Sequence, residues 1–154
     1  MSQVNVDGVG IEYQVTGHGR PVVLLHGWPD SGRLWRHQVP ALTDAGFQVI
    51  VPDLRGYGLS GKPGTVEAYS LPVLAGDVLA ILADQEVGRA HVVGHDWGAA
   101  LGWVLASFAP RAVTLRDRAW QLGETAVERI VERAARVTWA IRCSQSTRSA
   151  RLRS

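Results

Sequence analysis

The sequence of 154 residues predicts an α/β fold, in which a mostly parallel sheet carries helices on both faces. Two observations support this prediction. Short apolar runs typical of buried strands alternate with stretches whose apolar residues have helical spacing. Three of these runs, at residues 22–25, 47–51 and 90–94, lead directly into glycine-containing loops. The loops should therefore gather at one edge of the sheet, where open α/β sheets bind ligands.

The first half of the chain contains a predicted hairpin, a strand and a helix. Residues 4–6 and 11–15 alternate around the turn pair Asp7-Gly8 and should form two antiparallel strands. The buried strand at 22–25 follows. Ser31 can then cap a helix that stops at Gly46 and that Pro40 should kink or end early. The apolar face of this helix comprises Leu34, Trp35, Val39 and Leu42.

The second half continues the alternation and then loses it. After the strand at 47–51 we expect a loop at 52–70, a helix from about 71 to 84, a strand at 90–94 and a helix at 99–108. Beyond Pro110, residues 113–115 could begin a sixth strand, but charged residues at 116–118 interrupt the apolar run. We expect residues 1–115 to form a partial core and residues 116–154 a basic tail, helical or disordered.

Composition limits the classes of function. The net charge of +2 arises from the tail, because residues 1–115 have seven Lys and Arg against ten acidic residues, whereas residues 116–154 have nine Arg against four. The tail has no interleaved aromatic pattern or known binding motif, so we expect no nucleic-acid partner. No apolar run approaches the roughly 20 residues that span a bilayer. A single cysteine and the lack of a signal sequence favour a soluble cytoplasmic protein.

The most informative motif is Gly94-His95-Asp96-Trp97-Gly98, which lies between the strand at 90–94 and the helix at 99–108. Strand, sharp turn and helix together make a nucleophile elbow, whose glycines are needed where side chains would collide. The alternative is a simple turn with an aspartate hydrogen bond. A carboxylate at the tip, Asp96, points to attack on carbon and an alkyl-enzyme ester.

Two further motifs identify a family. His26-Gly27-Trp28-Pro29 follows the strand at 22–25, and Asp53-Leu54-Arg55-Gly56-Tyr57-Gly58-Leu59-Ser60 follows the strand at 47–51. With the elbow, they make the chain resemble the α/β-hydrolase superfamily, in its epoxide hydrolase branch related to haloalkane dehalogenases. The resemblance runs from about Val4 to Val113. It implies the N-terminal half of that fold, a small-molecule epoxide or related electrophile as substrate, and no cofactor or metal.

The resemblance also implies a role for each site residue. Asp96 is the nucleophile, and the backbone N–H groups of Trp28 and Trp97 form the oxyanion hole. Both indoles are also expected to line the substrate pocket, although either could be an ordinary core aromatic. Trp28 stands where dehalogenases usually have asparagine, which favours epoxide hydrolysis. Structural roles near the site are implied for His26, Gly27, Pro29, Gly94, His95 and Gly98, and an internal ion pair for Asp53 and Arg55.

Several parts of the family pattern have no counterpart in this sequence. No histidine follows His95, although the water-activating base follows the nucleophile in this fold. The distal acid and the cap with its tyrosines are also missing. We expect this chain alone to be a single-turnover alkyl acceptor or inactive, with a reading-frame shift near codon 110 as one explanation. An uncovered sheet should favour self-association. The alternatives are a haloalkane dehalogenase-like hydrolase and a non-catalytic binding fragment.

Overall fold

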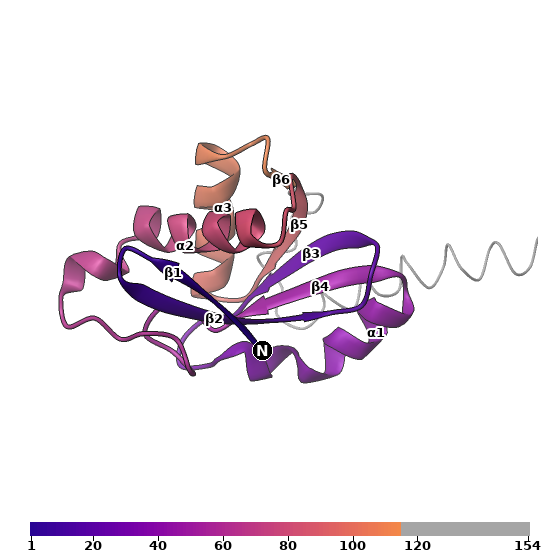
Figure 1. Ribbon diagram of the computed structural model, residues 1–154, viewed down its shortest axis with the longest axis horizontal. Helices are drawn as coiled ribbons and strands as arrows, with labels where there is room; N and C mark the ends of the chain where they lie inside the picture. The colour runs from indigo at the N-terminus through magenta and orange to yellow at the C-terminus, as the bar shows by residue number, and fades with distance from the viewer. Residues whose placement is uncertain (115–154) are drawn as a thin grey trace, which may run out of the picture.

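The computed structural model of the chain describes residues 1–114, which contain one mixed sheet of six strands in the order β1-β2-β4-β3-β5-β6 (Figure 1). Strands β1 and β2 pair antiparallel, as do β2 and β4, whereas β4, β3, β5 and β6 run parallel. The strands are β1 Ser2–Val6, β2 Val9–Thr16, β3 Arg20–Leu25, β4 Phe47–Pro52, β5 Ala90–Gly94 and β6 Val113–Thr114. The predicted α/β class is confirmed, and the predicted tail at 116–154 lies outside the described residues.

Helices cover both faces of the sheet. Helix α1 packs on one face, and α2 and α3 pack on the other (Figure 1). The α-helices are α1 Gln38–Asp44, α2 Leu71–Asp84 and α3 Trp97–Phe108, and two short 3₁₀ helices are η1 Gly32–His37 and η2 Val66–Tyr69. Helix α2 occupies the predicted range, and α3 begins at Trp97, two residues before the predicted start at residue 99.

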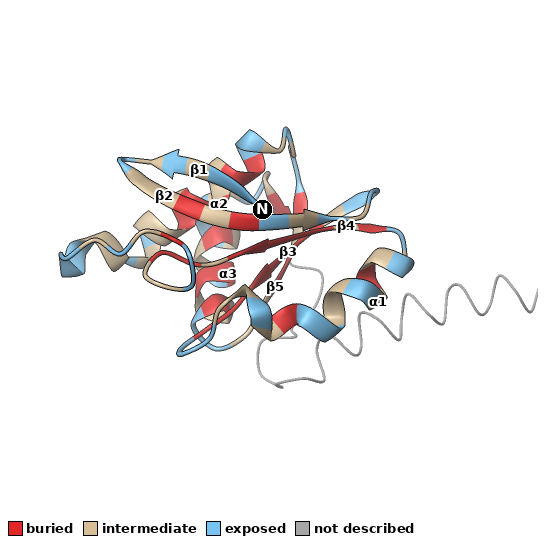
Figure 2. Cartoon of the chain, turned by 60° about the horizontal axis from the view of Figure 1, so that its bottom comes forward, coloured by how far each residue is buried: buried red, intermediate tan, exposed pale blue. Residues whose placement is uncertain are grey.

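The central strands are buried on both sides, which explains their continuous apolar sequence. Val22 and Leu24 of β3 belong to the cluster beneath α1, whereas Val23 and Leu25 belong to the cluster beneath α2 and α3. All four side chains are at most 1% exposed. Figure 2 shows this burial running through β3, β4 and β5, so the loops at their carboxyl ends start from a rigid base.

The single helix predicted from Ser31 to Gly46 is wrong, because the segment forms η1 followed by α1. The hydroxyl of Ser31 accepts a hydrogen bond from the N–H of Arg33, so the predicted cap is present. Pro40 does not end the helix. It lies in the first turn of α1, where backbone N–H groups have no partner within the helix.

The ends of the described sheet also follow the sequence pattern. At the hairpin between β1 and β2, Asp7 and Gly8 both have positive φ, and the N–H of Gly8 donates to the side chain of Asn5. At the opposite edge, Val113 is buried and pairs with Ala90, so the sixth strand is present over Val113–Thr114. Its predicted continuation at residue 115 lies outside the described residues.

Candidate active site

The turn between β5 and α3 has the strained geometry expected of a nucleophile elbow. Asp96 has φ 53° and ψ −120°, a conformation with left-handed φ that side chains rarely adopt. A Cβ on Gly94 would lie 2.3 Å from the carbonyl oxygen of Gly98, and a Cβ on Gly98 would lie 2.2 Å from that of Leu25. Both glycines are therefore required for the close approach of strand and helix.

The carboxylate of Asp96 lies beside the two backbone donors that the sequence predicts. The N–H of Trp28 donates to Oδ1 of Asp96 at 3.0 Å. Hydrogen bonding by the N–H groups of Trp97 and Trp28 lowers the pKa of the Asp96 carboxyl below its ordinary value. The Asp96 side chain makes no hydrogen bond that caps α3, so its geometry does not support the simple turn. The residue is exposed, which leaves the carboxylate accessible to a ligand.

The loop after β3 meets the elbow because the two strands are in register. Leu25 pairs with Gly94, and the N–H of His95 donates to the carbonyl of Leu25 at 2.9 Å. A Cβ on Gly27 would lie 2.4 Å from Oδ1 of Asp96, so glycine is the residue that permits this contact. The Trp28–Pro29 peptide bond is cis.

His26 is buried beneath this loop with both ring nitrogens engaged. Nε2 accepts a hydrogen bond from the N–H of Leu54 at 2.9 Å, which leaves the proton on Nδ1 to be donated to the carbonyl of Gly27 at 3.0 Å. Its side chain is fully buried, and this burial lowers its pKa. The arrangement agrees with the structural role implied for His26, because it ties the loop after β3 to the loop after β4.

The predicted ion pair between Asp53 and Arg55 is wrong, because Arg55 pairs with Asp77. Nη2 of Arg55 lies 2.6 Å from Oδ1 of Asp77 on α2, and Nε donates to Oδ2 at 2.9 Å. Both side chains are buried; burial raises the pKa of Asp77, and the Arg55 guanidinium opposes this shift. Asp53 instead accepts backbone N–H bonds from Gly32 and Leu59. Sequence reasoning missed Asp77, whose one signal is an acid on the apolar face of a helix.

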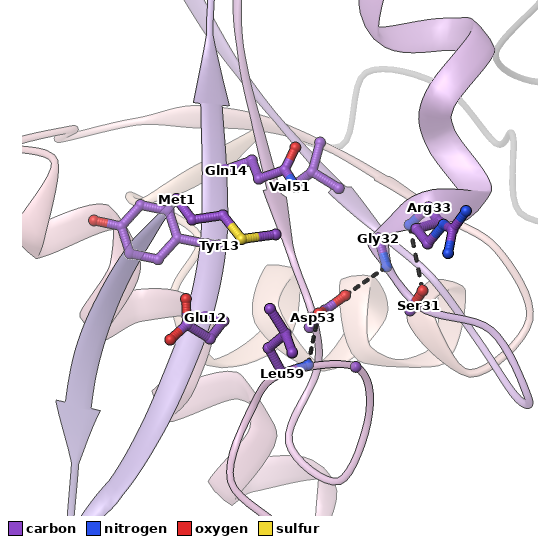
Figure 3. Close-up of a pocket in the computed structure, with 11 residues that line it drawn as sticks. Met1, Glu12, Tyr13, Gln14, Ser31, Gly32, Arg33, Val51, Asp53 and Leu59 are labelled. Carbon is purple, nitrogen blue, oxygen red and sulfur yellow. Dashed lines mark hydrogen bonds between the residues drawn. The ribbon is translucent and has the colours of Figure 1, made fainter.

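A hollow of about 470 Å³ lies beside Asp53 (Figure 3). Its walls come from β2, the start of η1 and the loop after β4, and include Glu12, Arg33 and Leu59. Figure 3 shows the Asp53 carboxylate directed to the backbone of Gly32 and Leu59, so this residue supports the wall. Asp96, Trp28 and Trp97 are not among its lining residues.

The two tryptophans expected to line the substrate pocket are exposed at the elbow. Trp28 and Trp97 are 67% and 59% exposed. Their role as pocket walls stays a prediction. His95 has a buried Nδ1 with no hydrogen-bond partner among residues 1–114. Within the same residues, no group of three His, Cys, Asp or Glu side chains could hold a metal, and no helix is long and apolar enough to cross a membrane.

Sequence comparison matches the chain to a fold family and to named proteins. A family model described as alpha/beta hydrolase fold matches residues 20–114. The chain is 46% identical over 102 residues to epoxide hydrolase A of Mycobacterium tuberculosis (strain ATCC 25618 / H37Rv), covering 64% of this chain and 32% of that protein. It is 43% identical over 106 residues to bifunctional epoxide hydrolase 2 of Sus scrofa, covering 69% and 19%.

Solved structures give a consistent result. The epoxide hydrolase VrEH1 from Vigna radiata superposes with a TM-score of 0.70 at 38% identity, covering 73% of this chain and 35% of that one. Epoxide hydrolase A from Mycobacterium thermoresistibile superposes with a TM-score of 0.70 at 41% identity, covering 73% and 36%. The chain therefore spans about a third of the length of three of these relatives and about a fifth of the fourth.

Proposed function

The chain belongs to the alpha/beta hydrolase fold family, and from this premise we propose that it is a hydrolase of the epoxide hydrolase type with Asp96 as its nucleophile. One observation carries the proposal. An exposed carboxylate is held in a strained turn with a backbone N–H at 3.0 Å from one of its oxygens. A carboxylate in this position can attack an electrophilic carbon and form an ester.

In the first half-reaction, Asp96 is alkylated. Oδ1 accepts the Trp28 N–H, and we assign the attack to the other oxygen, Oδ2. Oδ2 attacks one epoxide carbon, the bond from that carbon to the epoxide oxygen breaks, and the oxygen departs as an alkoxide that takes a proton from water. The lowered pKa of Asp96 keeps it ionised, as attack requires, at neutral pH.

In the second half-reaction, water adds to the ester carbonyl. Negative charge then develops on Oδ1, where the N–H groups of Trp28 and Trp97 can stabilise it. A general base that activates the water typically contributes about 10²- to 10⁴-fold in rate. No histidine follows His95 in these 154 residues, so this polypeptide taken by itself should stop at the ester after one turnover, or remain inactive.

The residue identity at position 28 favours epoxides over haloalkanes. The backbone N–H of Trp28 donates to the Asp96 carboxylate, and the residue is 67% exposed. By the family resemblance, the dehalogenases use an asparagine side chain there to hold the leaving halide. Epoxide opening releases no halide, so it does not require a group that binds one.

The test is the stoichiometry of reaction with a small aryl epoxide, followed by intact mass spectrometry. We expect one adduct of the epoxide's mass per chain and little free diol. Asp96→Asn should abolish the adduct, whereas Asp44→Asn, at an exposed carboxylate at the end of α1, should leave it unchanged. Halide release from a haloalkane without epoxide reaction would favour the dehalogenase alternative. The absence of any adduct would favour a non-catalytic fragment.

A further inference from the structure

The two backbone donors at Asp96 share a feature at the opposite ends of their peptide groups. The N–H of Trp28 belongs to the same peptide as the carbonyl of Gly27. That carbonyl oxygen accepts two hydrogen bonds, from Nδ1–H of His26 at 3.0 Å and from the N–H of Asp30 at 3.0 Å. The Gly27–Trp28 peptide is thus anchored at its oxygen while its N–H faces the carboxylate.

The second donor is anchored in the same way. The N–H of Trp97 belongs to the same peptide as the carbonyl of Asp96, and that oxygen accepts from the N–H groups of Ala99 at 3.0 Å and Ala100 at 3.3 Å. Three of the four anchors are therefore backbone N–H groups. The exception is the His26 ring, the one side chain in this set.

A donor at a peptide oxygen acts on the N–H at the other end for two reasons. The peptide is planar, so fixing the direction of C=O also fixes the direction of N–H. Hydrogen bonds in a chain also polarise one another, so a bond at the oxygen makes the N–H a stronger donor. The path from His26 Nδ1–H through the Gly27–Trp28 peptide to Oδ1 of Asp96 is such a chain.

We propose that His26 is a positioning residue whose Nδ1–H, by donating to the carbonyl of Gly27, aims and strengthens the Trp28 N–H at Asp96. The bond from Leu54 N–H to Nε2 is what places the proton on Nδ1. His26 thus joins two loops and, through the Gly27–Trp28 peptide, also affects the hydrogen bond to Asp96. The catalytic consequence rests on the proposed function, whereas the hydrogen-bond chain does not.

The proposal assigns opposite effects to the two half-reactions. Attack by the carboxylate removes negative charge from Asp96, so a stronger Trp28 donor holds back alkylation. Hydrolysis of the ester places charge on Oδ1, so the same donor favours that step. Loss of the His26 contact should therefore leave the alkylation rate constant unchanged or raised. A general structural defect would lower it.

The first test needs no substitution. Long-range ¹H–¹⁵N NMR of the 154-residue chain reports which ring nitrogen of His26 carries the proton. We expect a protonated Nδ1 and an unprotonated Nε2. A proton on Nε2 would overturn the proposal, because Nδ1 could not then donate to Gly27.

The second test separates the two contacts of the ring with a matched pair of variants. His26→Asn keeps an amide near the position of Nδ1, and His26→Gln extends one toward the position of Nε2. We expect His26→Gln to move the Trp28 amide proton upfield and to raise the pKa of Asp96, measured by ¹³C NMR of the carboxyl. His26→Asn should retain values near those of the unsubstituted chain. The Trp97 amide, anchored without His26, should be unchanged in both.

The outcomes separate this proposal from the proposed function. The opposite pattern would overturn the positioning role. In that pattern the Trp28 amide shift is perturbed in His26→Asn and normal in His26→Gln, so it depends on the contact of Nε2 with Leu54. Equal shifts at Trp28 and Trp97 would do the same, since they would indicate a general disturbance. If the expected shifts appear but the unsubstituted chain forms no epoxide adduct, the hydrogen-bond chain stands and the proposed function fails.

Discussion

Alanine substitutions at two glycines of α3 test whether the elbow has the close packing described above. A Cβ on Gly98 would lie 2.2 Å and 2.5 Å from the carbonyl oxygens of Leu25 and His26, which are backbone atoms of β3 and its loop. A Cβ on Gly102 would meet only Val92, at an ordinary contact distance of 3.5 Å. The two positions are four residues apart on one buried face of the same helix.

The two substitutions should change the free energy of unfolding in opposite directions. Gly102→Ala gains helix propensity, so the free energy of unfolding should rise by roughly 0.5–1 kcal/mol. Gly98→Ala forces backbone apart, and overpacking at a rigid site should lower the free energy of unfolding by about 3 kcal/mol. A combined difference of nearly 4 kcal/mol should separate the two thermal midpoints by about 8 °C or more.

Thermal unfolding followed by circular dichroism, with both variants and the unsubstituted chain measured under one condition, gives the comparison. Equal midpoints for the two variants would refute the reasoning, because the strand and helix would then not approach as closely as the elbow requires. A drop for Gly102→Ala as large as that for Gly98→Ala would have the same meaning.

Three further predictions concern stability and association. Asp77→Ala leaves the buried Arg55 unpaired and should lower the free energy of unfolding, measured in urea, by about 3–5 kcal/mol. The double variant Asp77→Leu with Arg55→Met should recover most of this loss. A loss near zero for Asp77→Ala would contradict the buried pair. Burial lowers the pKa of His26 from 6.5, with Asp53 and Asp30 opposing, so the unfolded chain takes up the proton first. The free energy of unfolding should therefore decline as pH falls below about 6.5, by up to about 1.4 kcal/mol per pH unit, and His26→Asn should lose this slope; identical profiles would show that His26 is not responsible. In the described sheet β6 pairs on one side only, so light scattering should give a mass above that of one chain; a monomer mass would contradict association through this edge.

The elements that could be predicted from sequence are those specified by local pattern. The strands β3, β4 and β5 are continuous apolar runs because both faces of the sheet are covered, and Gly94 and Gly98 mark a turn where a side chain would collide with backbone. The placement of the Trp28 N–H at Asp96 follows from the order of motifs along adjacent parallel strands. These features depend on few residues, close together in sequence or in register.

The features that could not be predicted depend on tertiary packing. Arg55 could have paired with any nearby acid, and its partner Asp77 is chosen by how α2 packs on the sheet. Asp53 does not pair with Arg55 and accepts hydrogen bonds from the N–H groups of Gly32 and Leu59. The spacing of its neighbours predicts Pro40 inside a helix, whereas the division into η1 and α1 places it in a first turn. None of these choices leaves a periodic signal in the sequence.

The most direct test of the central claim is to locate the site of alkylation. The chain is incubated with a small aryl epoxide, digested with a protease and analysed by tandem mass spectrometry. We predict a single ester on Asp96, within the peptide that contains Gly94 and Gly98, and unmodified carboxylates at Asp30, Asp44 and Asp53. Modification spread over exposed carboxylates, or an adduct that persists in Asp96→Asn, would contradict the account.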